Sequence, residues 1–302
     1  MSNALGGFLL VFATGICWIA VGISVSLCST RKWDYNVVQG LNYAVAIPVC
    51  LLIMLLFRPG AFSGEGLATV FGLGLLAGLT NFYAYVFTAE AMRRGPNGLV
   101  WGIMQAGMIG SFLMGILFFG EKAAPLRLAG LALILGGVLA MGSARSGGAG
   151  EKGKNWLLPA LGAFLLVMAG HCCSILPSYF SEAARGDSSF RTLSVYTGGL
   201  LGFAITTLPG MLRRKTRIKP GEWLVALSLA GMSIVTSIFL FYNGLNILAR
   251  NGCGGLGYPV AIGVCVTGFS LYSLLALKEK FPPLSRAGLC AVCVGIILIA
   301  LK

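Results

Sequence analysis

The chain has 302 residues, of which 57% are hydrophobic and 10% charged, and its mean hydropathy is +0.88. A soluble domain carries about 25% charged residues, so the composition excludes an ordinary soluble protein and favours a membrane protein. The net charge of +13 would suggest a nucleic-acid partner in a soluble protein. Here the basic residues lie in short segments between apolar runs, where they act as topology signals and lipid-headgroup contacts. We therefore expect a lipid bilayer and no nucleic acid as partners.

Apolar runs long enough to cross a bilayer, about 17–25 residues, recur along the whole chain. The short polar start, residues 1–4, lacks the basic residues and cleavage site of a removable signal peptide, so the first run is predicted to be a retained helix. Ten transmembrane helices are predicted, over residues 5–28, 36–57, 67–89, 97–119, 125–143, 156–180, 190–212, 222–248, 254–277 and 283–301.

A stretch rich in Gly, Ser and Lys separates the fifth predicted helix from the sixth. It predicts a first five-helix repeat over residues 1–143, a linker over 144–155 and a second five-helix repeat over 156–302. A duplicated phrase supports the division, because residues 121–131 and 279–289 match at an offset of 158. The identical pairs are Glu121/Glu279, Lys122/Lys280, Pro125/Pro283, Leu126/Leu284, Ala129/Ala287, Gly130/Gly288 and Leu131/Leu289.

An odd number of helices per repeat has a consequence for topology. The two halves must enter the membrane from opposite sides, which is an inverted repeat and favours alternating access around a site at the bilayer midplane. The fold class expected is therefore an all-α membrane protein with ten transmembrane helices in two inverted five-helix repeats. Glu121 and Glu279 lie at helix ends in both copies, so they are interpreted as interfacial structure that offsets or pairs with nearby charges.

These residues resemble a known family. Trp18 in the first helix, Gly120-Glu121 at the end of the fourth, Pro125 and Gly136-Gly137 in the fifth, and the second copy of the phrase are similar to the drug/metabolite transporter superfamily. The resemblance is to its ten-helix EamA-like branch, which is related to rhamnose and nucleotide-sugar transporters, and it covers the chain. It implies a transporter of small organic solutes. The small multidrug relatives place a proton-binding Glu in the first helix, where this chain has Gly15-Ile16-Cys17-Trp18.

The orientation of the termini stays open at this stage. Lys and Arg favour the cytoplasmic side, and the side that carries the termini holds only seven of the 22, so the bias places both termini outside the cytoplasm. The family resemblance implies that both termini lie inside. The seven are Arg58, Lys122, Arg127, Arg185, Arg191, Arg250 and Lys302.

Polar and aromatic side chains at membrane depth are candidates for the solute site, because each needs a partner or a water-filled cavity there. The alternative is that they bridge neighbouring helices or anchor the helix ends at the interface. The wider set includes Gln39, Tyr43 and Ser174. The residues predicted to bind substrate are Trp18, Asn42, Asn81, Tyr85, Trp101, Gln105, His171, Tyr196, Tyr242, Asn243, Asn246 and Tyr258.

His171 is the single histidine and lies well inside the sixth predicted helix. One hypothesis makes it a proton-coupling or substrate-binding group, since histidine ordinarily titrates near neutral pH. The other makes it a neutral side chain bonded to a backbone carbonyl between packed helices. No Asp or Glu falls at mid-depth, so the sequence offers no carboxylate proton relay.

The function predicted is a secondary transporter that moves a small metabolite, amino acid or sugar by alternating access, with protons or a counter-solute as coupling partners if any. The alternative is a non-transporting membrane sensor or assembly subunit. No hydrolase, metalloprotease or phosphate-loop motif is present, so we expect no enzyme, no catalytic residue and no cofactor. Cys290-x-x-Cys293 alone does not indicate a metal site. We expect a multi-pass protein of the cell inner membrane, as a monomer or homodimer.

Overall fold

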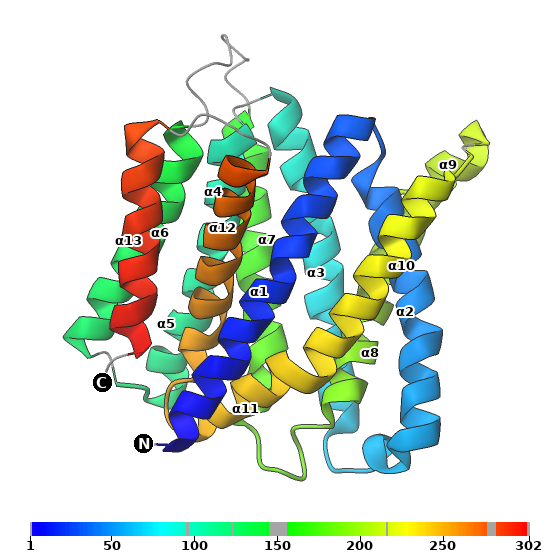
Figure 1. Ribbon diagram of the computed structural model, residues 1–302. Coiled ribbons are helices and arrows are strands. Elements are labelled where there is room, and N and C mark those ends of the chain that lie inside the picture. The colour runs from blue at the N-terminus through cyan, green and yellow to red at the C-terminus, as the bar shows by residue number, and fades with distance from the viewer. Residues whose placement is uncertain are drawn as a thin grey trace.

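The computed structural model describes residues 2–94, 97–122, 124–144, 156–215, 217–276 and 282–300. Over these residues every regular element is a helix, and Figure 1 shows the long helices standing side by side in one bundle. Residues 145–155 of the predicted linker, and Glu279 and Lys280 of the second repeated phrase, lie outside the described residues.

The described residues of the first half form six α-helices and two short 3-10 helices. Asp34 caps the second helix, because its side chain accepts a hydrogen bond from the backbone N–H of Asn36 at 2.9 Å. The elements are α1 (Ser2–Arg31), α2 (Tyr35–Phe57), η1 (Pro59–Phe62), α3 (Leu67–Arg94), α4 (Asn97–Gln105), η2 (Ala106–Met108), α5 (Ile109–Phe119) and α6 (Pro125–Ala144).

Over its described residues, the second half forms seven α-helices and three short segments of other helical type. Asp187 caps its second long helix by accepting from the backbone N–H of Ser189 at 2.7 Å. The elements are α7 (Leu157–Ile175), η4 (Leu176–Tyr179), α8 (Ser188–Thr206), α9 (Leu208–Arg214), α10 (Pro220–Val235), the π-helical η5 (Thr236–Phe241), α11 (Tyr242–Arg250), η6 (Gly254–Leu256), α12 (Gly257–Leu275) and α13 (Pro283–Ala300).

Three of the predicted continuous helices are interrupted. The helix predicted over 97–119 changes to a 3-10 turn at η2, and the one predicted over 222–248 carries the π-helical stretch η5. The one predicted over 190–212 bends by 43° between α8 and α9, where Pro209 stands in the first turn of α9. Proline has no backbone N–H to donate to the preceding turn, so a helix that reaches it bends or ends.

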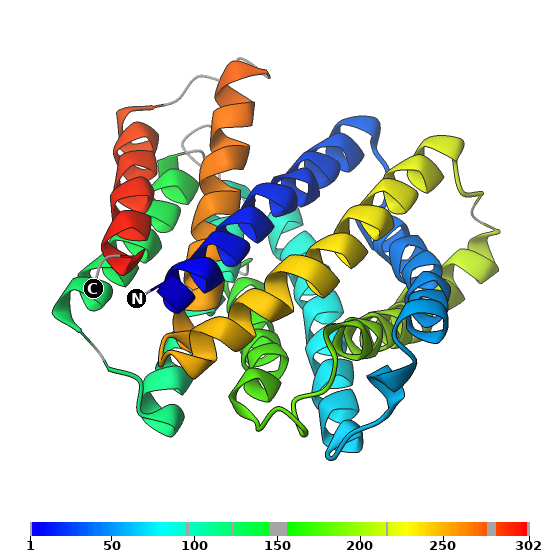
Figure 2. The ribbon, with the colours of Figure 1, turned by 60° about the horizontal axis from the view of Figure 1, so that its bottom comes forward.

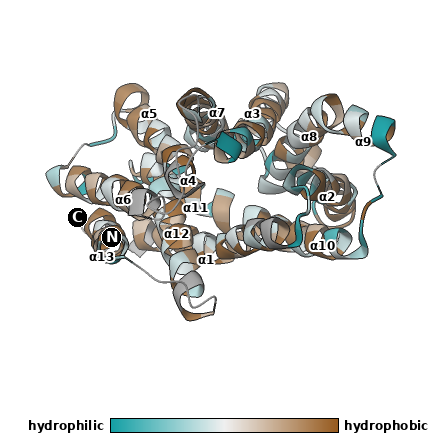
Figure 3. Cartoon of the chain, turned by 90° about the horizontal axis from the view of Figure 1, so that it is seen from above, coloured by the Kyte–Doolittle hydropathy of each residue, from teal (hydrophilic) through white to brown (hydrophobic). Residues whose placement is uncertain are grey.

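Seven helices among the described residues are long and apolar enough to cross a membrane, or eight if the bent pair α8–α9 is one span, and α6 and α13 are shorter apolar helices. Their outward faces are apolar as well. On α1, for example, Leu5, Leu9, Phe12 and Ile16 recur on one face and are exposed. Large apolar patches of this kind are rare on soluble monomers. The chain therefore has the architecture of a multi-pass, all-α membrane protein (Figure 3).

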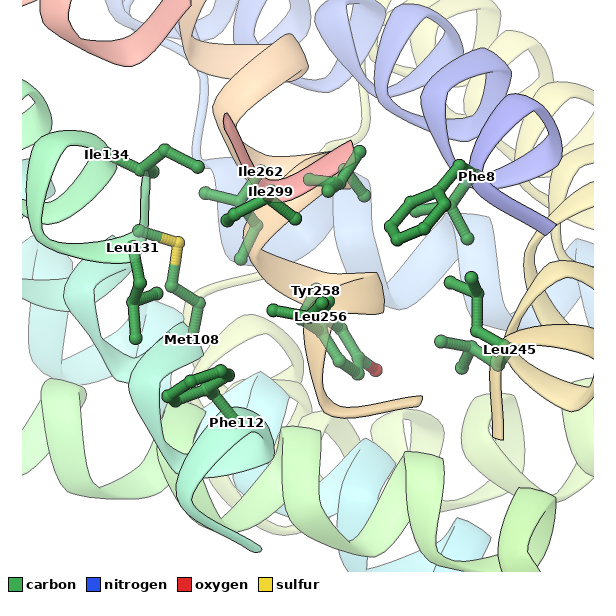
Figure 4. Packing of buried hydrophobic residues seen from close by; sticks show 14 of the residues in the cluster. Phe8, Met108, Phe112, Leu131, Ile134, Leu245, Leu256, Tyr258, Ile262 and Ile299 are labelled. Carbon is green, nitrogen blue, oxygen red and sulfur yellow. The ribbon is translucent and has the colours of Figure 1, made fainter. Parts of the chain in front are cut away.

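Residues far apart in the sequence build the largest buried cluster. Figure 4 shows Phe8 of α1 and Leu245 of α11 on one side of Tyr258 and Leu256, with Met108 and Phe112 on the other. In Figure 2, α1 lies between α12 and the segment formed by α10 and α11. The two halves of the chain are thus interleaved and share one core.

Candidate solute-binding site

A cavity of about 210 Å³ lies between helices of both sequence halves. The first half contributes side chains from α1, α2, α3 and α4, and the second half contributes side chains from α7, α8, α10, η5, α11 and α12. The paired helices α6 and α13, which lie side by side at one end of the bundle (Figure 3), contribute none. The cavity walls therefore come from the inner helices of each half.

The structure places ten of the twelve predicted binding residues around this cavity. Gln39, Tyr43 and Ser174 of the wider set line it too. Among the lining residues that sequence reasoning missed are Ser233, Ser237 and Cys265. The ten are Trp18, Asn42, Asn81, Tyr85, Trp101, Gln105, His171, Tyr196, Tyr242 and Tyr258.

Asn243 and Asn246 are outside the cavity lining. The side-chain amide of Asn243 donates to the backbone carbonyls of Ile238 and Phe239, both at 3.1 Å, within the π-helical stretch. Asn246 accepts a hydrogen bond from Arg191 at 2.9 Å. Both side chains therefore have partners within the protein, and neither reaches the cavity in this structure.

Aromatic rings form one wall of the cavity. The rings of His171 and Tyr258 stack with centroids 3.8 Å apart and planes 20° from parallel. Trp18 lies 5.0 Å from Phe241 and 6.3 Å from Tyr258, measured between ring centroids. Rings held against one another in this way offer a rigid apolar surface for an apolar part of a solute.

Amide groups supply polar contacts on another wall. The side chain of Asn42 donates to the amide oxygen of Gln39 at 3.0 Å, and Gln39 donates in turn to the hydroxyl of Tyr35. Within the described residues, Asn42 Oδ1 and His171 Nδ1 are buried without a hydrogen-bond partner. Buried polar atoms without a partner are costly, so both mark places where a polar group would be stabilised.

Arg191 is a buried charge beside this cavity. Its side chain is only 2% exposed and donates to the backbone carbonyl of Ser174, a lining residue. The sequence could have indicated this burial, because Arg191 lies one turn beyond the cap Asp187 and inside the predicted span 190–212. Among the described residues that line the cavity there is no Asp, Glu, Lys or Arg.

Glu121 joins the two sequence halves just beyond the end of α5. It lies between α5 and α6, is 8% exposed, and accepts a hydrogen bond from the hydroxyl of Tyr179 at 2.8 Å. The backbone N–H of Gly255 also donates to it, at 3.1 and 3.2 Å from the two carboxylate oxygens. Glu121 thus lies at a helix end, and its hydrogen bonds reach residues of the other half of the chain; its interpretation as interfacial structure stays a prediction.

Burial raises the pKa of the Glu121 carboxyl above its ordinary value, against the smaller effects of the hydrogen bond from Tyr179 and those from the backbone. The folded protein then binds this proton more tightly than the unfolded chain does. Its contribution to stability is complete below the unfolded pKa, about 4.3, and is lost as the pH rises through the folded pKa. We expect Glu121→Gln to remove this loss.

The check is the thermal unfolding midpoint of the purified protein across that pH range. Glu65→Gln, at an exposed loop position, is the matched control and should keep the wild-type profile. An identical decline of the midpoint in wild type and Glu121→Gln would show that Glu121 is not responsible.

Comparison with known proteins defines the fold only. No family model matches the chain, and no curated protein matches it in sequence. Among solved structures, 26 chains match. One of them, described as the crystal structure of a protein, superposes with a TM-score of 0.70 at 15% identity and covers 97% of this chain and 95% of its own. The chain therefore has a fold that also occurs in a crystal structure, along nearly its whole length.

Proposed function

We propose that this chain, with its shared all-helical fold, is a secondary transporter of the drug/metabolite transporter superfamily, in the ten-helix EamA-like branch. It moves a small organic solute across the cell membrane by alternating access between two inverted five-helix repeats. The observation that carries the proposal is the central cavity, since matching helices of both halves line it. A cavity at such an interface is where transporters built from repeats bind their solutes.

The helix positions support ten spans. Each predicted apolar run coincides with one helix or with a broken series of helices, in the same order along the chain. The seven long spans, the bent pair α8–α9 and the two shorter helices α6 and α13 give ten segments when all of them cross the membrane.

Four glycines support the inverted relation of the halves. A Cβ atom on Gly130 would lie 2.8 Å from the carbonyl oxygen of Gly295, and one on Gly137 would lie 2.5 Å from that of Gly288. The offset of 158 converts Gly130 into Gly288 and Gly137 into Gly295. Exchanging the halves therefore turns one contact into the other, which is the mark of a two-fold, self-complementary interface.

Other helix pairs follow the same exchange. By order within the repeats, α7 corresponds to α1, and the series α10–η5–α11 corresponds to α3. Helix α7 packs against α3 of the first half, and α1 packs in the same way against η5 and α11 of the second half. Likewise α1 packs against α12, and α7 packs against α4, which corresponds to α12. A pseudo-two-fold axis between the repeats explains this reciprocity, and two equivalent arrangements of the halves are what alternating access requires.

Irregular helical segments beside the cavity are suitable hinges. The π-helical η5 carries the lining residues Ser237 and Phe241, and the 3-10 turn η2 directly follows Gln105. Such breaks within longer helices often lie at functional sites. Rocking of the halves would also have to release the contacts of Glu121 with Tyr179 and Gly255.

The proposal is tested by measuring which metabolites raise the unfolding temperature of the purified protein, followed by counterflow of the stabilising solutes in proteoliposomes. The proposal expects at least one solute to do both. A solute that stabilises the protein without any counterflow would favour the alternative, a membrane sensor.

The proton-coupling role proposed for His171 makes a separate prediction. If its ring takes up and releases the coupled proton, His171→Gln should remove the pH dependence of uptake between about pH 5 and 8. Initial uptake rates in proteoliposomes measure this, with a fixed pH on the inner side. Unchanged pH dependence in His171→Gln would leave His171 the stacking role that its contact with Tyr258 provides.

A further inference from the structure

We propose that Arg191 makes the central cavity selective for solutes that carry a carboxylate group; this inference rests on the proposed transport function and specifies its substrate class. Arg191 belongs to the first turns of α8 and is almost fully buried. It contacts two residues that line the cavity, because its guanidinium lies over the ring of Tyr242 and donates to the backbone carbonyl of Ser174.

The guanidinium of Arg191 is bonded only to neutral groups among the described residues. Its Nη2 donates to the backbone carbonyl of Ser174 at 2.7 Å and to the hydroxyl of Ser178 at 3.0 Å, and its Nη1 donates to Asn246 at 2.9 Å. Its Nε is buried without a partner. The described Asp and Glu residues make no ion pair with it. Since arginine stays protonated in proteins, this is a buried charge that neutral dipoles alone stabilise.

The charge acts on the cavity through a thin wall. The guanidinium carbon lies 4.1 Å from the centroid of the Tyr242 ring, and the hydroxyls of Tyr242 and Ser174 are 3.3 Å apart. These hydroxyls share a hydrogen bond, so the one that accepts keeps its own O–H available to donate to a solute carboxylate. Inside a protein the dielectric constant is low, so a unit charge one side chain away still acts on a solute.

The sign of this field decides the class of solute. In the part of the chain that the structure describes, no Asp or Glu lines the cavity, so this lining offers a cationic solute no compensating charge. Transferring a charge from water into a protein costs free energy unless an opposite charge is near. A solute carboxylate beside Arg191 would lower this desolvation cost for both charges. The aromatic wall of Trp18, His171 and Tyr258 suits the apolar body of the same solute. The substrate class is therefore a small organic monocarboxylate.

The test uses matched pairs that differ only in charge: 3-phenylpropionate and its amide, and hexanoate and its amide. Binding is measured from the unfolding temperature of the purified full chain against solute concentration. We expect each acid to bind about tenfold or more tightly than its amide, which is about 1.4 kcal/mol.

The most informative variant is Asn246→Asp, which places a carboxylate at the position that already accepts from Arg191 and so neutralises its field. It should reduce the preference for the acids to less than about threefold, or 0.7 kcal/mol. Asn251→Asp adds the same charge at an exposed position at the end of α11 and should keep the full preference. Arg191→Gln, which removes the charge, is the second variant and should behave as Asn246→Asp does.

Equal binding of acid and amide to the wild-type protein, or an undiminished preference in both Asn246→Asp and Arg191→Gln, would overturn the inference. Counterflow separates this failure from failure of the proposed function. If other metabolites exchange in proteoliposomes while neither acid binds, the transporter proposal holds and the carboxylate proposal fails. If the acids bind preferentially but no solute exchanges, the recognition site holds and transport fails.

Discussion

Ser233→Trp should abolish solute binding and transport while leaving the protein folded. Ser233 lines the central cavity from α10, so an indole at this position occupies the space of the solute. Because the cavity has a volume of only about 210 Å³, we expect the apparent affinity for any transported solute to fall by about a hundredfold or more, which is about 2.7 kcal/mol.

The matched control is Ser228→Trp, on an exposed face of the same helix. It should keep wild-type affinity, as measured by thermal stabilisation with solute and by counterflow. Full binding and transport in a folded Ser233→Trp variant would show that the solute site lies elsewhere.

Gly78→Ala should be among the most destabilising single-methyl changes available in this chain. A Cβ atom on Gly78 of α3 would lie 1.8 Å from the backbone carbonyl oxygen of Val195 and 2.7 Å from the backbone nitrogen of Gly199, both in α8. Backbone atoms cannot rotate away, so the helices must separate. Close packing through small residues is a main source of stability between membrane helices, and overpacking a tight core costs about 1–3 kcal/mol, occasionally more; we expect at least the upper end.

Gly72→Ala is the control on the same helix, since no atom lies within 4 Å of its added Cβ. It should leave the protein as stable as wild type or up to about 1 kcal/mol more stable, because alanine is the better helix former. Unfolding in increasing denaturing detergent measures both. Equal midpoints for Gly78→Ala and wild type would contradict the close contact between α3 and α8.

Much of the helical architecture could be predicted from the sequence, because the cost of unsatisfied backbone groups in lipid makes long apolar runs helical. The interruptions could not. These interruptions depend on packing with other helices, and the apolar periodicity of the sequence does not indicate them. They are the π-helical stretch over 236–241 and the 3-10 turn over 106–108. Ten spans and inverted repeats remain proposals that this architecture supports.

Some of the cavity residues could be predicted from the sequence and others could not. Large polar or aromatic side chains such as Gln105 and Tyr85 stand out at membrane depth because they are costly in lipid, and the structure places them around one cavity. Ser233 and Ser237 gave little signal, since a serine hydroxyl can bond to its own helix. Asn243 has the same amide side chain as Asn81, which is costly to place in lipid. It nevertheless donates to backbone carbonyls of the π-helical stretch, and no sequence pattern indicates this.

Arg191 shows the limit of reading charges along the chain. A basic residue near the end of an apolar run ordinarily marks the interface, and only the fold shows that α8 carries it inward against Ser174 and Asn246. The role proposed for Arg191 would narrow the expected substrate from a small metabolite, amino acid or sugar to a monocarboxylate.

Alternating access is tested most directly by the reactivity of one cysteine at Ser233 in a chain whose nine native cysteines are replaced. A membrane-impermeant thiosulfonate is added to one side of oriented proteoliposomes at a time, and modification is followed by mass. We expect Ser233→Cys to be modified from either side, while Ser228→Cys, on the exposed face of the same helix, stays unmodified in the bilayer. Modification of Ser233→Cys from one side only, or from neither, would contradict alternating access through this cavity.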